Sequence, residues 1–216
     1  MSRIGNGKIW VLFCMTVMTG SKAAAKRETR MSEILDCAEN NFVEKGFHGA
    51  GISGIAKECG ISVGHLYHYF ASKDLLIEAV VERELMRQKE RLGDFCNLNA
   101  AEIRDQIAPL VIDIIMKHQD PFRTVLNFEI LAEAQRNPSV AAILHRYDGE
   151  IRDQFCAVLE KAGITTPFLR TEMLFTLFAG IPARTLRHPE QERPQFIEMM
   201  KPIITKILVG ENLPVK

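Results

Sequence analysis

The chain has 216 residues, of which 47% are hydrophobic and 25% charged, and 27 lysines and arginines balance 27 aspartates and glutamates. This length exceeds the usual size of one domain, and the apolar content suffices for two packed units. Because the formal net charge is zero, the composition excludes a general attraction to nucleic acid, and any such affinity must come from local clusters of charge.

Residues 1–21 form an N-terminal extension that can be interpreted in three ways. Basic residues precede an apolar run at 9–18 and alanines follow at 23–25, which is the outline of a secretory signal. The run is too short to cross a bilayer as a helix. The extension could instead be translated but disordered, or translation could begin at Met15 or Met18. We favour the later start, and expect a cytoplasmic protein without membrane association.

The first predicted helix covers residues 26–45. Ile34, Ala38 and Phe42 recur at four-residue steps on one face, and Gly46 is the expected stop. The segment 22–30 at its start is the one clearly basic patch of the chain.

Two short helices joined by a glycine turn follow. Apolar residues spaced by three and four positions occupy one face of 52–59, and Gly60 can take the left-handed conformation that ends this helix. Ser62 can cap a second helix over 63–70. Two short helices that cross at such a turn indicate a helix-turn-helix, whose second helix enters the major groove of DNA.

The two faces of the second short helix differ. Leu66 and Phe70 are expected to turn inward, which leaves the remaining side chains for base edges and phosphates. Lys73 follows at the start of a helix capped by Ser72, where a cation and free backbone amides can meet a phosphate. The candidate DNA-binding residues are Lys26, Ser53, Ser62, Val63, Gly64, His65, Tyr67, His68 and Lys73.

Residues 34–80 resemble the N-terminal domain of the TetR family of bacterial transcriptional regulators. The matching residues, in order and without gaps, are Ile34, Leu35, Ala38, Phe42, Gly46, Phe47, Ile55, Ala56, Gly60, Ser62, Gly64, Leu66, Tyr67, Tyr69, Phe70, Lys73 and Leu75. The resemblance implies an all-α protein, with an N-terminal three-helix helix-turn-helix DNA-binding domain and a C-terminal helical ligand-binding and dimerisation domain.

The sequence departs from the family pattern at two places. Ala50 and Gly51 stand where the family has a threonine pair that caps the second helix and touches phosphate, and His65 replaces the usual small residue after Gly64. We therefore expect a weaker cap, a weaker phosphate contact and an unusual base preference.

We assign residues 22–80 to the DNA-binding domain and 81–216 to the second domain, with a break in helical pattern at 93–99. The helix at 72–91 changes from apolar to charged midway, so it can join the domains and transmit a tilt. Helices are then predicted at 101–118, 121–137, 138–162, 167–187 and 194–209, most of them beginning at a proline. Pro109 is expected to kink the first of these.

The second domain contains candidates for a ligand pocket, which combines apolar walls with a few polar groups. They are Phe122, Arg123, Asn127, Phe128, Glu129 and Tyr147. Aromatic residues at helical spacing are core in most cases, and Glu129 with Glu133 at i, i+4 is more often a solvated stripe than a cation site. The family resemblance implies a small-molecule inducer for this domain.

The last two helices are apolar over more than one face, so they must be covered on more than one side. We predict that they form a dimer interface, as the resemblance also implies. The residues proposed for it are Leu174, Phe178, Ile181, Phe196, Ile203, Ile204 and Ile207. The alternative, left open by Pro202 in the last helix, is that both faces are buried within one chain.

The five cysteines lack a CxxC pair and predict free thiols in a reducing cytosol. Cys59, beside the turn, could instead sense oxidation. No phosphate loop or HExxH motif occurs. His65 and His68 could share a metal, but no third ligand stands at a useful spacing. We therefore predict no enzyme, cofactor or metal.

The sequence thus predicts a homodimeric DNA-binding transcriptional regulator. We expect it to act as a repressor that a small-molecule inducer releases from a palindromic operator. The alternative is a helical ligand-binding or enzymatic protein with a vestigial helix-turn-helix, which Ala50 and Gly51 make conceivable. An exported helical protein is the third reading.

Overall fold

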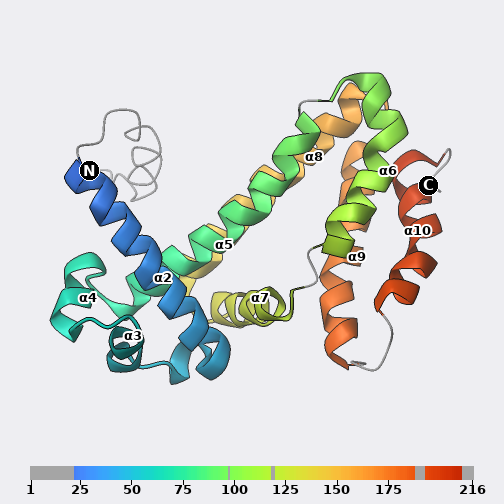
Figure 1. Cartoon of the computed structure of the whole chain (residues 1–216). Helices are drawn as coiled ribbons and strands as arrows, with labels where there is room; N and C mark the ends of the chain where they lie inside the picture. The colour runs from blue at the N-terminus through green and yellow to red at the C-terminus, as the bar shows by residue number, and fades with distance from the viewer. Residues whose placement is uncertain (1–21, 97, 118–119, 188–192, 211–216) are drawn as a thin grey trace. The chain divides into compact units, whose positions relative to one another are not determined.

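The computed structural model describes residues 22–96, 98–117, 120–187 and 193–210. Within these ranges the chain forms nine α-helices and no strand (Figure 1), which confirms the predicted all-α class. None of these helices is long and apolar enough to cross a bilayer. The extension predicted at 1–21 lies outside the described residues.

The chain divides into two compact units, Met1–Leu76 and Ile77–Lys216. We call these the first and the second unit. The division falls within α5 (Lys73–Cys96), four residues before the boundary expected after residue 80.

The first unit contains α2 (Lys22–Gly49), α3 (Ile52–Glu58) and α4 (Val63–Tyr69), with α3 packed against both of the others. α2 begins four residues earlier than predicted, so the basic segment 22–30 is helical. Gly46 interrupts the helix with φ 72°, at the predicted stop. The fully buried side chains of this unit include Ile34, Phe42, Phe47, Ile55 and Leu66.

The turn between α3 and α4 is fixed by local hydrogen bonds. Gly60 has φ 62°, and its N–H donates to the carbonyl of Lys57 at 3.1 Å while the N–H of Ile61 donates to Ala56 at 2.9 Å. This pair of bonds is a Schellman motif, which ends a helix at a left-handed glycine. Ser62 then caps α4 by accepting from the N–H of His65 at 3.1 Å, as predicted.

The N-terminus of α3 lacks a side-chain cap. Gly51 occupies the capping position in an extended conformation and makes no side-chain hydrogen bond. Since serine, threonine, aspartate and asparagine usually satisfy a free N–H here, the expected weak cap at the replaced threonine pair is confirmed.

The second unit holds the rest of α5 and five further helices: α6 (Ala100–Lys117), α7 (Pro121–Ala134), α8 (Pro138–Lys161), α9 (Pro167–Arg187) and α10 (Arg193–Val209). Each of the five begins within one residue of its predicted start. Asp120 and Asn137 cap α7 and α8 through their side chains, ahead of a proline at the first helical position. α6 packs against α8 and α10, and α9 also packs against α8 and α10.

Four residues predicted for a dimer interface lie in the core of the second unit. Leu174 and Ile204 are 0% exposed, and Ile181 and Ile207 are 6% exposed. They belong to one apolar cluster with residues of α6 and α8, including Ile107. Contrary to the prediction, Leu174 and Ile204 offer no surface to a partner chain, because their stripe is turned toward the protomer's own helices. Ile181 and Ile207 are largely buried in the same cluster.

Candidate nucleic-acid interface

α4 presents one polar face to solvent over an apolar face that anchors it. Leu66 is 0% exposed and Phe70, just after the helix, is 5% exposed, as predicted. Val63 and Tyr67 remain 39% and 45% exposed. The exposed set is Val63, Gly64, His65, Tyr67 and His68, which places the five predicted α4 contacts on the accessible side of the helix.

Gly64 lies in the first turn of α4, where no contact among the described residues requires a glycine. A Cβ built there would meet no atom within 4 Å, and the backbone conformation is not left-handed. Glycine inside a helix costs up to about 1 kcal/mol relative to alanine. The open space above Gly64 therefore suits close approach by a molecule outside the chain, as a base edge in a major groove would require.

An aromatic and cationic group that the sequence analysis missed supports the same face. The Arg27 guanidinium lies 5.1 Å from the centroid of the Tyr69 ring. The His65 and His68 rings lie 5.4 and 5.6 Å from the same ring. Arg27 lies seven residues before Ile34 and inside the predicted helix 26–45, so helical spacing placed it on the face of Ile34. Spacing alone did not indicate that this face meets Tyr69.

The remaining predicted DNA contacts also lie in the first unit. Lys26 is exposed on α2 and Ser53 is exposed on α3. Lys73 donates from Nζ to the backbone carbonyl of His48 at 3.3 Å, and Ser72 caps the helix by accepting from the N–H of Leu75. This contact leaves two ammonium hydrogens of Lys73 for a phosphate. The Ser62 hydroxyl is occupied in capping α4.

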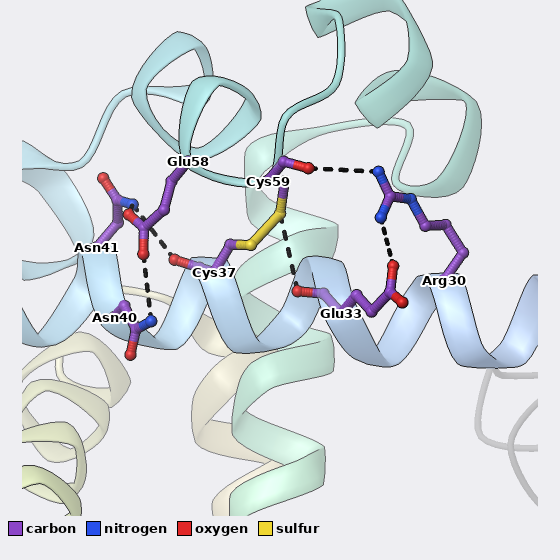
Figure 2. Close-up of a disulfide and its surroundings, with 7 residues drawn as sticks. All are labelled: Arg30, Glu33, Cys37, Asn40, Asn41, Glu58 and Cys59. Atoms are coloured by element: carbon purple, nitrogen blue, oxygen red, sulfur yellow. Dashed lines mark hydrogen bonds and ion pairs between the residues drawn. A yellow bond between two sulfur atoms is a disulfide. The ribbon is translucent and has the colours of Figure 1, made fainter.

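A disulfide joins two elements of this motif. Cys37 on α2 and Cys59 at the C-cap of α3 are bonded, with Cα atoms 5.8 Å apart (Figure 2). The prediction of free thiols is wrong for these two residues, because they are separated by 22 positions and only the packing of two helices brings them together. Cys156 is free. Cys14 and the side chain of Cys96 lie outside the described residues.

Two family models match the chain. One is described as bacterial regulatory proteins, tetR family, and covers residues 34–80; the other is described as tetracyclin repressor-like, C-terminal domain, and covers residues 102–208. The HTH-type transcriptional regulator UidR of Escherichia coli strain K12 is 32% identical over 164 residues, which are 74% of this chain and 82% of UidR. The chain belongs to the TetR family.

Further relatives agree with this assignment. The HTH-type transcriptional repressor AcnR of Corynebacterium diphtheriae is 25% identical over 176 residues, covering 70% of this chain and 90% of AcnR. The solved structure of Salmonella enterica GusR aligns with a TM-score of 0.65 at 25% identity, over 83% of this chain and 95% of GusR. The chain is accordingly a DNA-binding transcriptional regulator of the TetR family, and the predicted recognition is confirmed.

The second unit of this TetR-family chain places two predicted ligand residues around a buried carboxylate. Glu84 on α5 is 0% exposed. Arg123 donates to it from Nη1 at 3.1 Å and Asn127 from Nδ2 at 3.4 Å. Gln88 donates to both Glu84 and Asn127, at 3.3 and 2.7 Å. Arg123 and Asn127 thus link α7 to α5 through a connected polar network.

Tyr147 lies in a different environment from Arg123 and Asn127. It is 8% exposed, and its pKa is raised above the usual tyrosine value by burial and then by the nearby Glu82 carboxylate. Since Glu82 and Glu84 are two positions apart on one helix, their side chains point in nearly opposite directions. The described contacts therefore do not gather all six predicted ligand residues at one point. Phe122, Phe128 and Glu129 are partly buried on α7.

An apolar groove of about 510 Å³ lies between α9 and α10. Its lining residues are Glu172, Met173, Thr176, Leu177, Gly180, Ile181, Phe196 and Ile207. None of the six predicted ligand residues lines it, whereas three of the predicted dimer residues do. Within the described ranges, no three histidine, cysteine or acidic side chains form a group that could hold a metal.

Proposed function

We propose that this chain is a cytoplasmic repressor that binds a two-fold symmetric DNA operator as a homodimer and is released by a small-molecule inducer. The observation that carries the DNA-binding part is the exposed polar face of α4 over its buried anchors. The family supplies the class of function, and repression is supported by relatives such as AcnR, which is named a transcriptional repressor.

The surface of α9 and α10 supports the homodimer. Of the ten large hydrophobic side chains that are exposed among the described residues, six belong to these two helices: Phe168, Met173, Leu186, Met199, Ile203 and Val209. Met199 is 70% exposed. Exposed apolar side chains concentrated on two helices that pack together favour an interaction site there. A second copy packed by a two-fold axis would cover the same groove on both protomers at once.

The inducer would act through the second unit. A solved neighbour of this fold, FadR of Bacillus subtilis, is a complex with stearoyl-CoA; it has a TM-score of 0.66 and 16% identity, and covers 84% of this chain and 99% of FadR. We propose that the inducer contacts residues among the six predicted on α7 and α8. Operator and inducer favour different separations of the two α4 helices, so each weakens binding of the other.

Selection from a pool of random DNA duplexes by the full chain tests this function. We expect a palindromic consensus whose half-sites lie about one helical turn apart, roughly 34–36 Å. Lys73→Ala should weaken binding to all duplexes and lower the salt-dependence slope by about one. His65→Ala should alter preference at a few base pairs, each worth roughly 1–3 kcal/mol.

Lys161→Ala is a matched control for the lysine variant. Lys161 also donates from Nζ to a backbone carbonyl, that of Leu98, but it belongs to the second unit. Its removal changes the net charge by the same amount and should leave the salt slope unchanged. If no consensus emerges, or if the two lysine variants lose equal affinity, the proposed interface is wrong.

A further inference from the structure

The Cys37–Cys59 disulfide lies at the point where the helix-turn-helix changes direction. Cys59 is the C-cap of α3 and is followed at once by Gly60 and Ile61, whose hydrogen bonds set the turn into α4. Because Cys37 belongs to α2, the bond ties this turn covalently to the longest helix of the first unit.

Polar contacts hold the same junction without the covalent bond. Arg30 on α2 donates from Nη2 to the Cys59 carbonyl at 3.3 Å and pairs with Glu33 (Figure 2). Asn40 and Asn41 both donate to the Glu58 carboxylate, at the last residue of α3. The end of α3 therefore stays against α2 when the sulfurs are separate, and both redox states are expected to fold.

The two sulfurs are suited to repeated opening and closing. Both cysteines are partly exposed, so oxidants and reductants can reach them. The Cα separation of 5.8 Å lies in the usual range for disulfides, so the bond forms without moving the helices. When reduced, the Cys59 thiol has an acceptor in place, because the Glu33 carbonyl lies 3.7 Å from its sulfur.

We propose that Cys37 and Cys59 form a reversible redox switch in which the disulfide state binds the operator more tightly than the dithiol state. The disulfide fixes the end of α3, so less motion of the turn and α4 must be lost when DNA binds. Thiols are kept reduced in the bacterial cytosol, where a disulfide is usually transient or a sensor. The effect on DNA rests on the proposed function, whereas formation of the bond does not.

The chemistry requires a two-electron oxidant, for which a hydroperoxide suffices. One thiolate attacks the O–O bond to give a sulfenic acid, and the second thiol displaces water from that sulfur to form the S–S bond. With hydrogen peroxide, two thiol hydrogens and two electrons convert the oxidant into two waters. A dithiol of the thioredoxin class reverses the step by exchange and becomes a disulfide itself.

The first test measures the bond without DNA. The full chain is fully reduced, treated with stoichiometric hydrogen peroxide and compared by intact mass, free-thiol count and thermal unfolding. We expect the loss of two hydrogens, the loss of two thiols and an increase in melting temperature of about 5 °C, all reversed by dithiothreitol. The Cys37→Ser/Cys59→Ser variant should show none of these changes, and Cys156→Ser should behave as the parent chain.

The second test measures affinity for the duplex obtained by selection. The oxidised chain should bind with a Kd about threefold to tenfold lower than that of the reduced chain. The Cys37→Ser/Cys59→Ser variant should have a Kd near that of the reduced chain, with or without peroxide. Failure to form the Cys37–Cys59 bond, equal affinity in the two states, or tighter binding by the reduced state would each overturn the switch. Absence of any selected duplex would instead refute the proposed function, and the thiol measurements would still decide whether the pair is redox-active.

Discussion

Arg170 carries a positive charge into the interior of the second unit, where it is 2% exposed. Its guanidinium donates to the carbonyls of Thr165 at 2.6 Å, Ile207 at 2.6 Å and Gly210 at 2.8 Å. Two of these acceptors belong to the C-terminal end of α10, where free carbonyls and the helix dipole favour a cation. One residue near the start of α9 thus anchors the end of α10.

Replacing Arg170 with methionine should lower the free energy of unfolding by about 2–4 kcal/mol, because three carbonyls lose a charged donor and that of Ile207 is left buried. Urea denaturation measures the loss. Arg152→Met is the matched control, since Arg152 is 32% exposed and pairs with Asp148 at 3.6 Å and with Glu172 at 3.8 Å. Arg152→Met should lower the free energy of unfolding by less than about 1 kcal/mol. Equal losses in the two variants would show that the carbonyl contacts of Arg170 contribute little to stability.

Tyr147 should make stability depend on alkaline pH. Burial and Glu82 raise the pKa of its phenol, so the folded chain keeps the proton while the unfolded chain begins to lose it near pH 10. The unfolded state then binds fewer protons, and stability falls as the pH rises above about 10.

Urea unfolding of the parent chain and Tyr147→Phe at about pH 8 and about pH 10.5 checks this direction. The parent should lose roughly 0.5 kcal/mol more than the variant between the two conditions. An identical loss in both chains would mean that the folded and unfolded states hold this proton equally well.

At the scale of helices, local chemistry determined what could be predicted. Proline starts, serine caps and the glycine stops at Gly46 and Gly60 all act within a few residues, and the structure places the corresponding helix ends close to their predicted positions. The disulfide and the contact between Arg27 and Tyr69 join segments far apart in sequence. Such contacts depend on how helices pack, which periodicity does not specify.

The direction of an apolar face was likewise beyond the sequence. The pattern in α10 showed two apolar stripes, but it did not distinguish Ile204, which is 0% exposed, from its neighbour Ile203, which is 49% exposed. A stripe that meets its own protomer and one that meets a partner use the same residue types. For the same reason, the predicted ligand residues Arg123 and Asn127 gave no sign of the buried Glu84 that engages them.

The first turn of α4 provides a separate test of DNA contact. Gly64→Ala should raise the free energy of unfolding by about 0.5–1 kcal/mol, since alanine favours the helix and meets open space. It should nevertheless weaken operator binding by about tenfold, equivalent to about 1.4 kcal/mol, by holding the backbone away from the bases.

Gly93→Ala is the control for this variant. Gly93 is also an exposed helical glycine whose added Cβ would meet no atom within 4 Å, but it belongs to the second unit. It should gain similar stability without changing DNA affinity. Unchanged affinity in Gly64→Ala would remove Gly64 from the interface.

For the whole molecule, the exposed face of α10 allows a clean test of dimerisation. Ile203→Lys places a charge on the proposed partner surface, and sedimentation should show a folded monomer that no longer binds the operator tightly. Leu131→Lys is its control, because Leu131 on α7 is also 49% exposed. If both variants remain dimeric, the interface lies elsewhere.

Ile204 is unsuited to this experiment. Its side chain is 0% exposed, so a lysine there would bury an unpaired charge and unfold the second unit whatever its oligomeric state. Circular dichroism of the Ile203 and Leu131 variants should therefore match that of the parent chain before their masses are compared.

The position of the division between the two units within α5 has a practical consequence for cutting the chain. Proteases cleave extended, exposed segments, and domain boundaries in loops usually provide one. Here residues 76 and 77 lie within the continuous helix Lys73–Cys96. Brief digestion with a protease of broad specificity should therefore not release a DNA-binding fragment that ends near residue 76. A recombinant fragment should extend well into α5 to keep its last helix wound.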